Sequence, residues 1–102
     1  MDIQGIIAVK QVAGTASIQS GTTAIAFNPT RSSFAIQNQG TSVLYVLLGG
    51  GATSTNFHFS LKGGSANDDG NGGTLSQAEG VVYVGTVSVA GSLLRYTTLE
   101  TS

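Results

Sequence analysis

Two neighbouring apolar runs decide the fold class of this sequence: FAIQN at residues 34–38 and VLYVLL at residues 43–48, joined by QGTS at residues 39–42. In the first run, large apolar side chains alternate with small or polar ones, which is the period of a half-buried strand. The second run is apolar on both sides, so it either lies inside a core or carries an interface on its outer face. Because the joining segment is short and polar, the two runs predict a β-hairpin.

Further strand candidates alternate in the same way between turns rich in Gly, Asn and Pro: residues 22–27, 57–61, 81–89 and 93–99. We expect Phe57, Phe59 and Leu61 to point inward, and residues 62–74 to form a long polar loop. Only Ala90-Gly91-Ser92 separates the last two candidates, so they are expected to pair antiparallel. With seven or eight short strands and no segment of helical period, the sequence predicts an all-β protein: a single antiparallel β-sandwich or jelly-roll-like domain.

The N-terminal segment differs from the rest in its weaker pattern. We expect residues 1–20 to form an N-terminal arm with a first strand at residues 6–12, and residues 21–102 to form the β-sandwich domain. An arm of this kind is able to add a strand to the edge of a neighbour's sheet, because main-chain hydrogen bonds make little demand on sequence.

Charged residues are scarce, at 9% of 102 residues with a net charge of −1, whereas an average soluble domain carries about 25%. This scarcity and the 15 glycines argue against a helical bundle. No two basic residues are neighbours, which argues against nucleic-acid binding. A soluble monomer normally presents a mixed charged surface, so we expect part of this surface to be covered by copies of the chain or by a partner.

The chain contains no cysteine, which excludes disulfides and thiolate metal sites. Its first residues lack the basic segment of a secretory signal. No apolar run approaches the roughly 18 residues that a membrane-spanning helix needs. We therefore expect a protein made in a cytoplasm, without a cleaved signal and without membrane association.

His58 is the only histidine, so a hydrolytic triad would need it as the base. Strand alternation directs it away from the Phe57 and Phe59 side, which favours a surface histidine over a catalytic one. One histidine without cysteine cannot supply a zinc site. The sequence predicts no catalytic residue, no cofactor and no metal ligand.

Residues 67–72, NDDGNG, place Asn67, Asp69 and Asn71 at the alternate spacing of a calcium-binding loop. The twelfth position is Ala78 instead of the bidentate glutamate that such loops use. Asp, Asn and Gly are also the common residues of ordinary turns. The flexible-loop interpretation is therefore favoured over a calcium site.

One pattern resembles small virion structural proteins of tailed bacteriophages, in which an Arg begins a strand of the form hydrophobic-x-Ile-x-Asn and a second hydrophobic strand ends in Gly. Here Arg31 is followed by FAIQNQG at residues 34–40 and LYVLLG at residues 44–49. Residues 85–87 and 98–100 are also similar to the last strands of that group. The resemblance implies a non-enzymatic virion component, such as a capsid decoration (cement) protein or a head or tail accessory protein.

This resemblance covers about residues 30–100 and implies a homo-oligomer, dimer or trimer, that binds the major capsid protein on the capsid surface and stabilises the shell. Arg31 would then hold a loop through carbonyl groups or pair with an acidic group of the shell. The arm and the outer face of residues 43–48 would be contact surfaces. The candidate interface residues are Ile6, Ile7, Val9, Leu44, Val46, Leu48 and Arg31.

The alternative function is a receptor- or glycan-binding module on a phage fibre or tail. Such a module would show an exposed aromatic cluster beside polar loops. Tyr45, Tyr83 and Tyr96 are able to stack on sugars, although tyrosines in strands more often belong to cores or interfaces.

Overall fold

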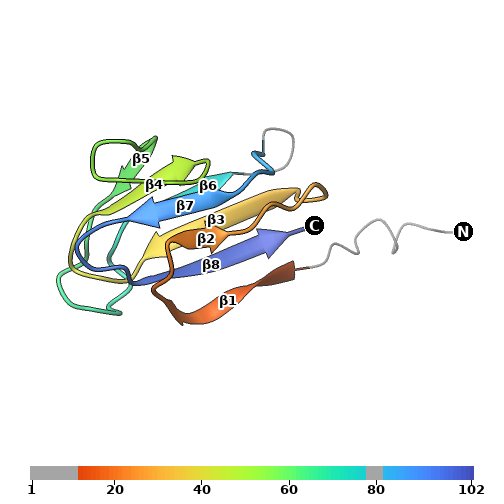
Figure 1. Ribbon diagram of the computed structural model, residues 1–102. Helices are drawn as coiled ribbons and strands as arrows, with labels where there is room; N and C mark the ends of the chain where they lie inside the picture. The colour runs from red at the N-terminus through yellow and green to blue at the C-terminus, as the bar shows by residue number, and fades with distance from the viewer. Residues whose placement is uncertain (1–11, 78–81) are drawn as a thin grey trace, which may run out of the picture.

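The computed structural model describes residues 12–77 and 82–102, and in this part the chain is all-β. Eight strands form two four-stranded antiparallel sheets that pack face to face (Figure 1). This confirms the predicted fold class. No helix in the described part is long and apolar enough to cross a membrane. The strands are β1 Val12–Gln19, β2 Thr23–Ile25, β3 Ser33–Asn38, β4 Leu44–Leu48, β5 Phe59–Leu61, β6 Thr74–Gln77, β7 Val87–Ala90 and β8 Tyr96–Thr101.

The pairing of the strands is nested: β1 pairs with β8, β2 with β7, β3 with β6 and β4 with β5. Sheet A has the order β1-β8-β3-β6, and sheet B has the order β2-β7-β4-β5. A single long hairpin that wraps around a common core produces this arrangement, which is the topology of a jelly roll. The structure therefore selects the jelly roll among β-sandwich folds.

Both predicted hairpins are wrong. β3 lies in sheet A and β4 in sheet B, while β7 lies in sheet B and β8 in sheet A. At the first crossing Asn38 is fully buried, and its side-chain amide donates to the carbonyl oxygens of Ser42 (2.8 Å) and Leu61 (3.0 Å). These bonds fix the crossing, because they join the last residue of β3 in sheet A to the connection that follows it and to β5 in sheet B.

The core lies between the two sheets. Leu44 and Val46 of β4 are fully buried and pack with Ile36, Val87 and other residues from both sheets. The prediction that they belong to a surface interface is therefore wrong. Strand alternation places them on the inner face of sheet B, and the outer face of β4 carries Tyr45 instead.

Three smaller differences concern strand bounds and faces. β1 includes residues 14–17, which were expected to follow the first strand, and residues 1–11 lie outside the described part. β6 was not predicted, because its sequence TLSQ is mostly polar. Leu61 is buried as expected, but Phe57 and Phe59 are 38% and 39% exposed. Phe59 lies on the edge strand β5, and Phe57 contacts Tyr45 on the outer side of the sheet.

Candidate interaction surfaces

The charged side chains of the described residues are unevenly distributed. Arg31 and Glu100 form a buried ion pair at one end of the sandwich. The others belong to the loop 62–73 or to the connection before β8, at the opposite end, on the left in Figure 1. These are Lys62, Asp68, Asp69 and Arg95. Arg95 and Asp68 pair with each other, with 2.9 Å between Arg95 Nε and Asp68 Oδ1.

The outer face of sheet A carries no charged side chain among the described residues. Phe34 and Ile36 point into the core, so the alternate positions of β3 and their partners in β6 and β8 point outward. Its centre is Ala35, which lies between Leu99 and Ser76 across the strands. Leu99 is 51% exposed. We call this surface the sheet A face; it consists of Ser33, Ala35, Gln37, Thr74, Ser76, Thr97, Leu99 and Thr101.

β1 forms one edge of sheet A next to this face. It is eight residues long, and its sequence VAGTASIQ contains neither a charge nor a proline. Natural edge strands usually carry such residues, because they prevent pairing with another chain. The described part of β1 has only the register shift between Thr15 and Gln19 as an irregularity.

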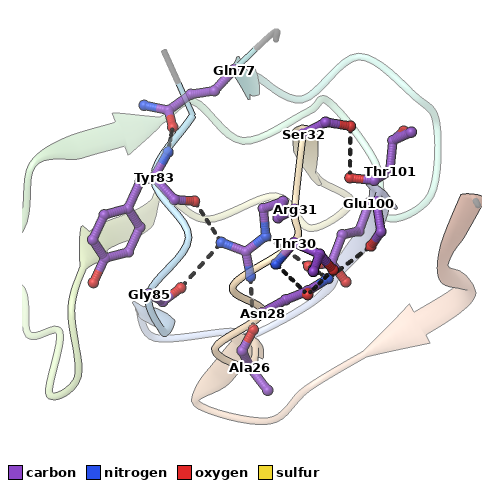
Figure 2. Close-up of polar contacts among 11 residues, drawn as sticks. Ala26, Asn28, Thr30, Arg31, Ser32, Gln77, Tyr83, Gly85, Glu100 and Thr101 are labelled. Carbon is purple, nitrogen blue, oxygen red and sulfur yellow. Dashed lines mark hydrogen bonds and ion pairs between the residues drawn. The ribbon is translucent and has the colours of Figure 1, made fainter. Parts of the chain in front are cut away.

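Arg31 lies just before β3 and is fully enclosed by its own chain (Figure 2). Its Nε donates to Glu100 Oε2 at 2.6 Å. Nη1 donates to the carbonyl oxygens of Tyr83 (2.6 Å) and Gly85 (3.1 Å), and Nη2 donates to that of Ala26 (2.7 Å). The guanidinium thereby connects the loop before β7, the end of β2 and the last strand.

The turn before β3 is attached to the same ion pair. Asn28 Nδ2 donates to Glu100 Oε2 (3.2 Å) and to Ser102 Oγ (2.9 Å). Asn28 Oδ1 in turn accepts the backbone N–H of Thr30 at 3.1 Å. These contacts close the turn against the end of the chain (Figure 2).

The predicted interface residues therefore do not form one surface. Of the two roles expected for Arg31, it has the first, since it holds loops through carbonyl groups. It is buried and therefore unable to pair with an acidic group of another chain. Leu48 packs against the core. Ile6, Ile7 and Val9 lie outside the described residues.

The outer face of sheet B is partly covered by the loop between β4 and β5. Ser88 of β7 donates through Oγ to the carbonyl of Gly49 (2.6 Å) and accepts the N–H of Ala52 (3.0 Å). Leu47 is only 9% exposed. The two hydrogen bonds of Ser88 hold this loop against the sheet. An outward side chain of β4 such as Leu47 is therefore buried within a single chain.

Beside this loop lies an open groove of about 710 Å³. Tyr45 is one of the lining residues, and its ring contacts Phe57 with 4.7 Å between ring centroids and an interplanar angle of 47°. The remaining lining comes from the connection between β3 and β4, the β4–β5 loop and the connection between β7 and β8. The lining residues are Thr41, Ser42, Val43, Tyr45, Ser54, Gly91 and Ser92. Of these residues only Tyr45 was a candidate from the sequence, because the others come together only in the fold.

His58 is exposed, as the sequence predicted, and its ring has a specific role in the backbone. The N–H of Leu48 donates to His58 Nδ1 at 3.0 Å. In a Ser–His–acid triad Nδ1 carries the proton and donates it to the carboxylate. Here Nδ1 accepts instead, so the bond stabilises the β4–β5 loop and opposes the arrangement of a triad.

Asp69 organises the loop 62–73 around its own carboxylate. The backbone N–H of Asn71 (2.8 Å), the hydroxyl of Ser65 (2.7 Å) and the N–H of Ala66 (2.8 Å) all donate to it. These bonds lower the pKa of Asp69 from 3.8 to about 2. The carboxylate thus has an internal role in a turn.

No protein-family model matches this chain, and no curated protein and no solved structure matches it either.

Proposed function

We propose that this protein is a non-enzymatic structural component of a virus particle, of the capsid decoration type, whose copies associate through the sheet A face. The observation that carries the proposal is the absence of charge from this face among the described residues. A surface that meets a second copy of itself must be self-complementary. A face of hydroxyl, amide and alkyl groups meets this condition, because it brings no like charges together.

Two further observations support the assignment. Jelly rolls occur among viral capsid domains, as well as among lectins and cupins, so the fold is compatible with the proposal at the level of analogy. The resemblance of residues 30–100 to small phage virion proteins points in the same direction. Weak contacts of an uncharged face become effective in a lattice, since many of them act together.

The test of self-association is the native mass of the full chain over a range of concentrations. We expect a dimer or trimer, and dissociation to monomer in Leu99→Lys, which places a charge in the middle of the face. Phe27→Lys is the matched control: Phe27 is 62% exposed but lies after β2, outside the face. A wild-type monomer at every concentration, or an unchanged oligomer in Leu99→Lys, would overturn the assignment of this face.

The virion role has its own test, co-sedimentation of the chain with empty shells of the major capsid protein from the same phage. We expect the wild-type chain to sediment with the shells and to raise their melting temperature. A chain that forms oligomers but stays in the supernatant would contradict the decoration role and leave the self-association intact.

A further inference from the structure

We infer that the groove beside Tyr45 is a binding site for a neutral saccharide. Its volume of about 710 Å³ falls in the range of about 300–1,000 Å³ that small-molecule sites occupy. This inference goes beyond the proposed virion role and does not depend on it, since a monomer would present the same groove.

The hydroxyl groups of the groove are free to bind a ligand. Five of the lining residues carry a hydroxyl group: Thr41, Ser42, Tyr45, Ser54 and Ser92. Within the described residues, none of these hydroxyls is hydrogen-bonded to another part of the protein. By contrast, the hydroxyl of Ser88 on the same sheet is already hydrogen-bonded to the β4–β5 loop. Each free hydroxyl is able both to donate and to accept, which matches the hydroxyls of a sugar ring.

Tyr45 supplies the aromatic element of the site, and Phe57, which is not a lining residue, packs beside it. Tyr45 and Phe57 lie with ring centroids 4.7 Å apart, and Phe57 is 38% exposed. The apolar face of a pyranose ring packs on such rings, while the phenol hydroxyl remains available as a polar contact. An exposed aromatic cluster beside polar loops is also the feature expected of a glycan-binding module.

The charge of the site selects among ligands. No lining residue is charged, and the nearby guanidinium of Arg95 is paired with Asp68. An anionic sugar or a phosphate would therefore find no free cation among the lining residues. A purely apolar ligand would strip water from the hydroxyls without replacing its hydrogen bonds. A neutral saccharide needs no cation, and its own hydroxyls are able to replace the hydrogen bonds of the displaced water.

Gly91 allows two of the connections that line the groove to lie close together. A Cβ at this position would lie 2.7 Å from the carbonyl oxygen of Val43, so any side chain there would push the two connections apart. The glycine lets the β7–β8 connection approach the β3–β4 connection, which brings Ser92 to the same groove as Ser42.

The experiment applies the full chain to an array of neutral, sialylated and sulfated glycans, followed by titration of the best neutral oligosaccharide by calorimetry. We expect binding to neutral glycans without preference for the acidic ones. Tyr45→Ala should weaken binding by about tenfold or more, because the stacking surface is lost. Tyr45→Phe retains the packing on Phe57 and should weaken binding by about two- to tenfold through the lost hydroxyl.

The matched control is Tyr83→Phe, which removes the same hydroxyl from a tyrosine that does not line the groove and should bind like the wild type. Thermal melting of each variant confirms that it is folded. Absence of any neutral glycan among the hits, preference for acidic glycans, or unchanged affinity in both Tyr45 variants would overturn the inference. None of these results depends on whether the chain forms oligomers or binds shells.

Discussion

Arg31 and Glu100 are 69 residues apart in the sequence and form a buried ion pair, with 2.6 Å between Arg31 Nε and Glu100 Oε2. The Arg31 side chain is fully buried and that of Glu100 is 17% exposed. The pair joins the start of β3 to the end of β8, which are neighbours in sheet A. Three carbonyl oxygens accept further guanidinium hydrogens, so the buried cation is well satisfied.

Replacing Arg31 by Ala should lower the free energy of unfolding by about 3–5 kcal/mol, because it leaves Glu100 and three carbonyl groups without their partner. Urea unfolding followed by circular dichroism measures this loss. Arg95→Ala is the control, since its pair with Asp68 is 34% and 41% exposed and contributes little. Equal losses in the two variants would contradict the structural role of Arg31.

Asn38→Ala should cost about 2–3 kcal/mol in the free energy of unfolding, because buried groups of Ser42, Leu61 and Gly40 lose their hydrogen-bond partner. Asn38→Asp should cost more at pH 7, since a carboxylate would face three carbonyl oxygens, and should recover partly in acid as it becomes neutral. Asn67→Asp, in the exposed loop, is the control. A loss that is independent of pH in Asn38→Asp would argue against this geometry.

Gly72→Ala should destabilise the protein by about 2 kcal/mol, because the added Cβ would overlap the carbonyl oxygen of Asn38. Gly50→Ala is the matched substitution, as a Cβ there meets nothing within 4 Å. It should leave the melting temperature unchanged or raise it slightly, since Ala restricts the unfolded chain. Similar melting temperatures for both variants would show that the loop 62–73 does not pack against β3 as described.

The turn around Asp69 should open in acid. Hydrogen bonds from Asn71, Ser65 and Ala66 lower the pKa of Asp69 to about 2, so their stabilisation is complete above pH 3.8 and disappears as the pH falls to about 2. The protection of the Ala66 and Asn71 amides, measured by NMR as the exchange rate relative to the intrinsic rate at each pH, should fall through this window. Asp69→Asn should abolish that dependence, whereas Asp68→Asn should retain it. Constant protection from pH 4 to 2 in the wild type would contradict the assignment.

The fold class was predictable from the sequence, but the pairing of strands was not. Alternation in residues 34–38 identifies which side of β3 is buried, and this is a property of one strand. The partners of β3 are β6 and β8, tens of residues away, so a short polar connection after residue 38 looks the same in a hairpin as in a crossing between sheets. β6 was not predicted because it is an edge strand, and an edge strand needs few apolar residues that would form a recognisable pattern.

The candidate surfaces were predictable only in part. The scarcity of charge led to the prediction that part of the surface is covered. In the fold, uncharged residues occupy the outward positions of sheet A. The groove was beyond reach of the sequence, since Thr41, Ser54 and Ser92 belong to three separate connections. Leu44 and Val46 were predicted on the outer side of their strand, whereas they lie on the inner side. When both sides of an apolar strand are buried, the sequence has no alternation that distinguishes the inner side from the outer one.

The nested pairing also determines when the protein is able to fold during synthesis. β8 lies between β1 and β3 in sheet A, yet it is made after all the other described strands. Within the described residues β1 has no partner in that sheet until β8 has been made, and most pairs must close over long stretches of chain, which slows folding. Nascent chains therefore expose apolar strands until translation has passed β8, and deletion of residues 96–101 would remove the strand that joins β1 to β3 in sheet A.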